Sequence, residues 1–338
     1  MMRSATQKST TSRAATSKEG PTDGPQCRWV MIKKVQFELS PSQVYKLSNK
    51  SPIFHIFFTS QGGRTASDPI RLSGHNIEQF QDLLWALQTD PLPDAVEIPL
   101  PRLLSVAELA FKYQFKPLGH WSMSGIRRLV SMPNNPKIRQ APDISLSRLL
   151  KLSILYQQHD LCSSLQSNWL TRVYRRELSP FAAITVGDKC ALPHFLGHAM
   201  YVHMVEMACR IANCERIDLG SPLTHSQNLH IFCGYYSLQA YWRQIPQSPP
   251  TYPHSPECRS SQNCRAAWVK RWKASSSSEF SAFPDVDVLR RILELQRRLV
   301  ADPVLKGSMP IGCRDRALDA VIQKRTEVSN NMHHHFDI

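Results

Sequence analysis

Residues Asp68 to Leu87 read DPIRLSGHNIEQFQDLLWAL and hold a strand, a turn and a helix in one short segment. Ile70 and Leu72 alternate with polar neighbours, which is typical of a half-buried strand. A Ser-Gly step ends that strand. Asn76 is suited to cap a helix that starts at the next residue. The apolar residues that follow share one helix face, at positions 77, 80, 83, 84 and 87.

Segments on either side of this unit extend the pattern. Upstream, Trp29–Ile32 predicts a first strand, and Val35–Leu39 is either its hairpin partner or its continuation. Ser51 and Pro52 start a helix, with serine at the N-cap and proline at the first helical position. Downstream, residues 104–130 predict a helix hairpin. We expect one small sheet that holds 35–39 and 70–72, flanked by helices around 51–58, 77–88 and 104–130, with a core shared by Phe54, Phe80, Leu84 and Leu109.

The order and spacing of these elements resemble the BTB/POZ domain family, in particular the divergent BTB proteins abundant in fungi. The matching motifs are Ser51 with Phe54, Phe80 with Leu83 and Leu84, and the hairpin from Leu104 to Phe115. The resemblance covers roughly residues 30–135 and extends through the helical region to about 210. It implies a protein that oligomerises through its BTB surface, commonly as a homodimer, and recruits a partner protein as an adaptor or a transcriptional regulator.

The loop after the helix near Phe58 bears on the identity of that partner. BTB adaptors of cullin-type ubiquitin ligases often carry a hydrophobic-x-Glu step there, as the resemblance implies. Residues Thr59 to Arg64 read TSQGGR and contain no glutamate. This difference speaks against cullin binding and leaves the partner unidentified.

The expected fold class is α+β, with a BTB/POZ-like core followed by an all-helical extension. Residues 1–26 lack apolar periodicity and are expected to form a disordered tail. Residues 27–135 form the BTB/POZ-like domain, which ends at a proline-rich boundary. Residues 136–245 form the helical extension, because apolar stripes recur there at helical spacing. Residues 246–338 combine a Pro/Ser linker with a C-terminal helical appendix.

Composition narrows the class of protein. The chain has 338 residues, 42% of them hydrophobic, and a net charge of +14 that is spread along its length. Such a charge alone gives weak, salt-sensitive attraction to polyanions. No secretory signal follows Met1 and no apolar run approaches membrane-spanning length, so we expect a cytoplasmic or nuclear protein without a membrane segment. The nine cysteines are then expected to be reduced thiols.

No catalytic motif is present, and we predict that the protein is not an enzyme. One group of residues has the chemistry of metal ligands, namely Cys258, Cys264 and Cys313, with His254 or Cys233 as a fourth member. The five residues between Cys258 and Cys264 exceed the usual gap in structural zinc sites. We therefore expect unrelated thiols and no cofactor, with zinc as the alternative. The histidines at 333–335 are interpreted as part of a solvated tail.

Two surfaces are candidates for binding macromolecules. The strand Trp29, Val30, Met31 and Ile32 is expected to be a sheet edge that pairs with a second copy, with Val44 and Leu47 completing the contact. The segment 254–273 interleaves tryptophans with basic residues, which suits stacking on bases. The same spacing lets a helix dock its aromatic face on a core, and we favour that interpretation. The predicted function is a noncatalytic protein-interaction module, and the alternative is a nucleic-acid-associated transcriptional regulator.

Overall fold

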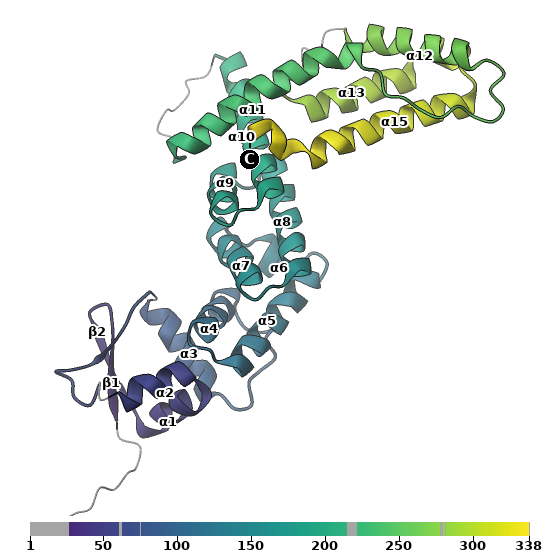
Figure 1. The fold of residues 1–338 in the computed structure, drawn as a ribbon. Coiled ribbons are helices and arrows are strands. Elements are labelled where there is room, and N and C mark those ends of the chain that lie inside the picture. The colour runs from purple at the N-terminus through teal and green to yellow at the C-terminus, as the bar shows by residue number, and fades with distance from the viewer. Residues whose placement is uncertain are drawn as a thin grey trace, which may run out of the picture. The chain divides into compact units, whose positions relative to one another are not determined.

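The computed structural model describes residues 27–337, apart from 61–62, 75, 215–221, 278–279 and 281. The expected disorder of residues 1–26 lies outside the described residues. The structure is a helix-dominated α+β fold with a small three-stranded sheet (Figure 1). Two compact units, here called the N-terminal and the C-terminal unit, divide between Met123 and Ser124. The division falls inside helix α5 (Lys116–Ser131) and not at the expected position 135/136, and residues 136–338 belong to a single unit.

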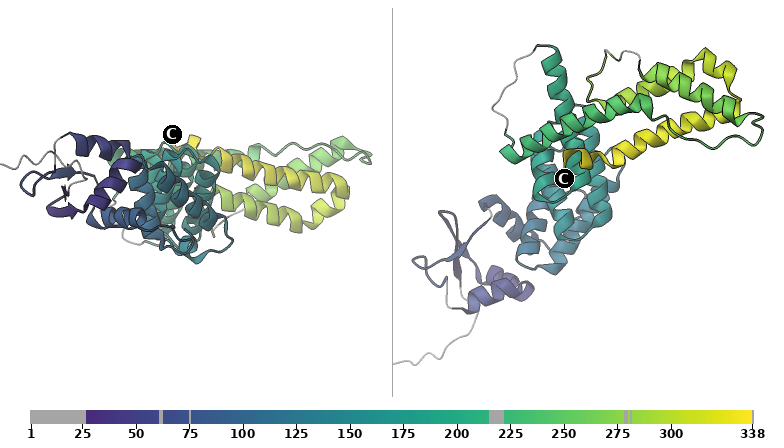
Figure 2. Two further views of the ribbon diagram at one scale, coloured as in Figure 1. Left: turned by 90° about the horizontal axis from the view of Figure 1, so that it is seen from below. Right: turned by 45° about the horizontal axis from the view of Figure 1, so that its top comes forward.

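The sheet of the N-terminal unit contains β1 (Arg28–Ile32), β2 (Val35–Leu39) and β3 (Ile70–Leu72) (Figure 2). β1 and β2 form an antiparallel hairpin, and β3 runs parallel to β1, which gives the order β2-β1-β3. This arrangement confirms that 35–39 and 70–72 lie in one small sheet. It also shows that 35–39 is a hairpin partner and not a continuation of the first strand.

β1 is the central strand, so the expectation that Trp29–Ile32 forms a sheet edge is wrong. One side of β1 pairs with β2 along its whole length. The other side pairs Val30 to Ile32 with β3, and the Trp29 N–H donates to the Gly63 carbonyl. Gly63 has a positive φ of 75°, and a Cβ there would lie 2.6 Å from the Trp29 oxygen. Glycine at this position therefore lets the loop approach β1 and accept the Trp29 N–H.

Four helices accompany the sheet: α1 (Pro41–Lys50), α2 (Pro52–Thr59), α3 (Ile77–Gln88) and α4 (Leu100–Lys112). Ser51 caps α2 and Asn76 caps α3, as the sequence predicts. Helix α1 begins at a capping box formed by Ser40 and Gln43. Helix α4 carries Pro101 in its first turn, where proline is tolerated.

The N-terminal core lies between the sheet and these helices. Phe54, Phe80 and Leu109 are buried in one cluster, which confirms three of the four predicted core residues. Leu84 is only partly buried and packs against the cluster from its margin. Phe80 is fully buried and meets Phe37 of β2 edge to face, with ring centroids 5.8 Å apart. Phe80 therefore connects α3 to the sheet.

Truncation of Phe80 is expected to destabilise the N-terminal unit. Phe80→Ala removes a buried ring and should lower the free energy of unfolding by about 3–5 kcal/mol. Phe111→Ala is the matched control, because Phe111 is 43% exposed in the same unit. Urea denaturation measures the loss, and hydrogen exchange of α3 and α4 peptides assigns it to this unit. A loss below about 1 kcal/mol, as for an ordinary surface change, would place Phe80 outside the core.

The C-terminal unit is all-helical in the described residues after α5. Its first part contains α6 (Pro136–Arg139), α7 (Asp143–Leu155), α8 (His159–Tyr174), α9 (Pro180–Lys189) and α10 (Pro193–Ala212). Its second part contains α11 (His225–Gln244), the 3-10 turn η1 (Ile245–Gln247), α12 (Ser261–Ser276), α13 (Val288–Ala301), α14 (Pro303–Ser308) and α15 (Ile311–Asn330). Helices α11, α12, α13 and α15 lie side by side in a bundle (Figures 1 and 2).

The last described residues form a short 3-10 helix, η2 (Met332–Phe336), which packs on α10 and α11. Met332 and Phe336 are completely buried, so the interpretation of residues 333–335 as a solvated tail is wrong. Two glycines make this contact possible. A Cβ on Gly197 of α10 would lie 2.6 Å from the His333 Cα, and a Cβ on Gly234 of α11 would lie 2.2 Å from the Phe336 ring.

Enlargement of Gly197 is expected to displace η2. The added methyl group of Gly197→Ala would press on the His333 backbone, and such overpacking costs about 1–3 kcal/mol. Gly307→Ala is the control, because no atom lies within 4 Å of a Cβ there and alanine favours helix. We expect Gly197→Ala to lower the melting temperature and Gly307→Ala to leave it equal or higher. Equal melting temperatures for both variants would contradict this packing.

Candidate interaction surface and metal cluster

The structure corrects the residues expected to form the interaction surface. Val30 and Ile32 are buried on the central strand, and Val44 and Leu47 are buried on the inner face of α1. Only Trp29 and Met31 keep part of their side chains exposed. Period-two and period-3.6 patterns identify the apolar faces of strands and helices. In this unit those faces are buried in the unit's own core. A contact with another chain must therefore use other side chains.

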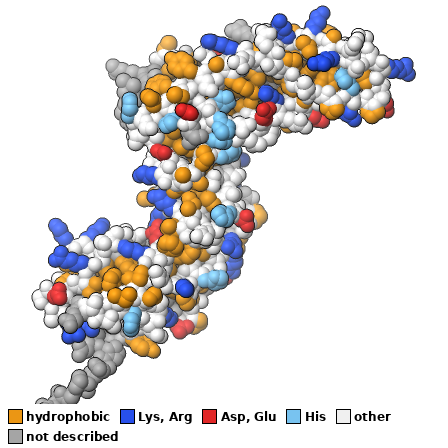
Figure 3. Space-filling model, viewed as in Figure 1, with side chains coloured by type: hydrophobic (Ala, Val, Ile, Leu, Met, Phe, Trp, Pro, Cys, Tyr) orange, Lys and Arg blue, Asp and Glu red, His pale blue; other side chains and the backbone are white. Residues whose placement is uncertain are grey.

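The N-terminal unit exposes a different set of large apolar residues. Tyr45 on α1 and Ile56 on α2 are 60% and 61% exposed, and Val35 on β2 is 42% exposed. Helices α1 and α2 pack on each other, and the Ser48 hydroxyl is 3.0 Å from the His55 Nδ1. β2 is an edge of the described sheet. Hydrophobic side chains gather on this unit in the view of Figure 3.

The second candidate site lies at the end of the C-terminal bundle where α12 and α15 both begin (Figure 1). Cys264 is in the first turn of α12, and Cys313 is in the first turn of α15. His254 and Cys258 belong to the irregular segment that precedes α12. The fold thus brings His254 together with the three cysteines that the sequence singled out.

The ligand atoms of these four residues, here called the Cys3His cluster, all lie within 4.8 Å of one another. The sulfurs of Cys258 and Cys264 are 3.4 Å apart. The His254 Nδ1 is 3.9 Å from the Cys258 sulfur and 3.7 Å from the Cys313 sulfur. Cys233, the alternative fourth ligand, is exposed on α11 and is not in the cluster. His254 is therefore the fourth member.

Groups around the cluster hold its members in place. The Ser255 N–H donates to the Cys313 sulfur at 3.2 Å. The Arg316 guanidinium on α15 donates to the His254 carbonyl, which fixes the backbone of the irregular segment. The Tyr252 hydroxyl is buried and has no hydrogen-bond partner among the described residues. Local sequence patterns did not single out Ser255, Arg316 or Tyr252, because their roles depend on contacts with distant residues.

The cluster affects the acidity of its own groups. A hydrogen bond with Cys264 lowers the pKa of the Cys258 thiol. Burial raises the pKa of the Cys264 thiol, and the hydrogen bond with Cys258 raises it further. Burial, followed by the charges of the three thiols, also raises the pKa of the Tyr252 hydroxyl. These directions are typical of thiols packed against one another, where ionisation of one discourages ionisation of the next.

The tryptophans of the 254–273 segment are core residues. Trp268 and Trp272 on α12 are fully buried. The Trp268 indole donates to the Pro250 carbonyl at 3.0 Å, and the Trp272 indole donates to the Ile245 carbonyl at 2.8 Å. This confirms that the aromatic face docks on a core, and neither indole is accessible for stacking on a base. Residues 246–256 are therefore bound to α12 and do not behave as a free linker.

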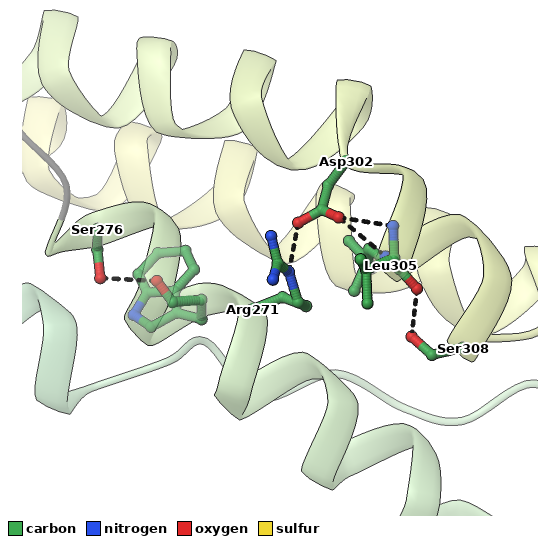
Figure 4. Close-up of polar contacts among 7 residues, drawn as sticks. Arg271, Ser276, Asp302, Leu305 and Ser308 are labelled. Atoms are coloured by element: carbon green, nitrogen blue, oxygen red, sulfur yellow. Dashed lines mark hydrogen bonds and ion pairs between the residues drawn. The ribbon is translucent and has the colours of Figure 1, made fainter.

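An ion pair joins α12 to the junction of α13 and α14 (Figure 4). The Arg271 guanidinium donates to Asp302, whose side chain is almost completely buried. Asp302 also caps α14 by accepting hydrogen bonds from the N–H groups of Val304 and Leu305. Burial alone would raise the pKa of Asp302, but the hydrogen bonds from Leu305 and Arg271 outweigh burial and lower it.

Stability of the C-terminal unit is expected to depend on the ionisation of Asp302. A lowered pKa in the folded state contributes stability above the unfolded pKa of about 3.9, and this stability is lost as pH falls through the folded value. Asp302→Asn should lower the free energy of unfolding by about 1–2 kcal/mol at pH 7 and reduce its decline below about pH 4. Urea denaturation at a series of pH values measures both effects.

The control for this series is Asp315→Asn. Asp315 is 61% exposed and its carboxylate is 3.6 Å from Arg314, so its substitution should leave the pH profile unchanged. Parallel profiles for the wild type and Asp302→Asn would contradict the role of the buried carboxylate.

Comparison with known proteins identifies no relative: no family model, no curated protein and no solved structure matches the chain. In the part of the chain that the structure describes, no helix combines the length and the apolar character needed to cross a membrane.

Proposed function

We propose that the protein is a noncatalytic interaction module that self-associates through its N-terminal unit and recruits a partner protein in the cytoplasm or nucleus. The observation that carries this proposal is the exposure of Tyr45 and Ile56 on the adjacent helices α1 and α2. Exposed apolar patches can mark interaction surfaces, and two neighbouring helices each expose a large apolar side chain here. β2 forms an edge of the described sheet and packs beside α1, so that edge can extend the same contact.

The resemblance to BTB/POZ domains supports the same function. The N-terminal unit contains a small sheet and the helices α1 to α4, and a small sheet with flanking helices is what the resemblance implies. BTB-like proteins commonly form homodimers, and closed two-fold dimers are the commonest soluble oligomers. A second copy is therefore the occupant that we assign to the surface formed by α1, α2 and β2.

The nucleic-acid alternative has less support. With Trp268 and Trp272 buried, the 254–273 segment offers only exposed cations such as Arg265, Lys270 and Lys273 on the outer face of α12. Cations without accessible aromatic rings give phosphate contacts, which are independent of base sequence and weaken with salt. This face would support a secondary, electrostatic affinity for nucleic acid.

Light scattering of the full chain tests self-association. Between high and low micromolar concentration we expect a mass near twice the 38.5 kDa of one chain. Ile56→Asp should convert the dimer to a monomer with unchanged helicity, because it places a charge in an apolar contact. Ile144→Asp is the control, since Ile144 is 71% exposed on α7 of the other unit. A monomer mass at every concentration, or a dimer that persists in Ile56→Asp, would overturn the proposal.

A further inference from the structure

The Cys3His cluster has the dimensions of a tetrahedral metal site. Bonds of about 2.3 Å to sulfur and 2.0–2.1 Å to nitrogen place two sulfurs about 3.8 Å apart and a sulfur and a nitrogen about 3.6 Å apart. The cluster has a sulfur–sulfur distance of 3.4 Å and sulfur–nitrogen distances of 3.7 and 3.9 Å. The sulfurs are much farther apart than the 2.05 Å of a disulfide. The other pairs of ligand atoms lie within 4.8 Å of one another, so a small inward movement brings all four atoms around a single ion.

We propose that Cys258, Cys264, Cys313 and His254 bind one structural zinc ion. Three thiolates and one imidazole form a ligand set that favours zinc over the oxygen-binding cations magnesium and calcium. Four protein ligands complete the tetrahedron and leave no position for water or substrate, so the ion has a structural and not a catalytic role. This proposal rests on the C-terminal unit and is independent of the proposed self-association.

Two kinds of neighbour favour deprotonated sulfur in the cluster, against the burial of Cys264, which opposes it. Cys264 and Cys313 each lie in the first turn of a helix, where the helix dipole stabilises a thiolate. The Ser255 N–H donates to the Cys313 sulfur, as backbone groups do around metal-bound thiolates. Arg316 holds the carbonyl of His254 and so limits the movement of the ligand that comes from the irregular segment. These contacts fix the ligands before the ion binds.

The bound ion would fasten the irregular segment and the adjoining α12 to the start of α15, which is distant in sequence. Through His254 and Cys258 it holds the irregular segment, through Cys264 it holds the start of α12, and through Cys313 it holds the start of α15. The four ligands are not held together in the unfolded chain, so zinc binds the folded state preferentially. Zinc binding therefore stabilises the folded bundle.

The proposal is tested on the full chain purified under reducing conditions without added chelator. Elemental analysis should give one zinc per chain, and titration of metal-free protein with zinc chloride should raise the melting temperature. Cobalt(II) in place of zinc should give the absorption bands of a tetrahedral thiolate complex. Cys264→Ser should weaken zinc binding by more than about 100-fold, beyond the loss caused by removing a partner outside the ligand set.

Cys233→Ser is the matched control, because Cys233 is an exposed cysteine outside the cluster. It should keep the full zinc content and the cobalt spectrum. If Cys264→Ser does not fold, removal of zinc from the wild type by a chelator and recovery of the melting temperature with zinc chloride provide the same test. A wild-type chain that is metal-free and shows no thermal shift with zinc would overturn the proposal. Loss of zinc in Cys233→Ser would overturn the assigned ligand set.

Discussion

The irregular segment at residues 248–260 must be held by other parts of the chain, because its backbone forms no helix or strand. Backbone groups outside regular structure need partners when they are buried. Here the Trp268 indole and the Arg316 guanidinium bind carbonyls of the segment at Pro250 and His254. The arrangement of the bundle depends on this constraint, since the segment lies against both α12 and α15. Without these contacts the starts of the two helices would lose their common anchor.

The individual strands and helices of the N-terminal unit could be predicted from sequence, but the pairing of its strands could not. Ile70 and Leu72 predict β3, and Asn76 predicts the start of α3, because strand alternation and helix capping depend on only a few residues. The central position of β1 in the sheet could not be predicted in this way. Alternation shows that a strand has a buried face but does not say how many strands pair with it. β1 pairs with β2, β3 and Gly63 because of the paths of the connecting loops. The alternation pattern does not predict those paths.

The candidate metal site shows the same limit. Its residue types were visible in the sequence, but the spacing between Cys258 and Cys264 differs from that of common zinc motifs. Cys313 joins them only because α13 and α14 return the chain to the start of α12.

The contacts around α12 differ in what they contribute. The Arg271–Asp302 pair joins a partly exposed guanidinium to a buried carboxylate, so desolvation offsets much of its attraction. Trp268 and Trp272 bury large apolar side chains and also donate hydrogen bonds to two carbonyls, and both features stabilise the packing of α12. Neither kind of contact fixes the direction of the thiols at the helix start. Three sulfurs and an imidazole packed within 4.8 Å would gain little from one another as neutral groups. A shared cation would give that geometry a physical reason, because it would replace these weak contacts by four coordinate bonds.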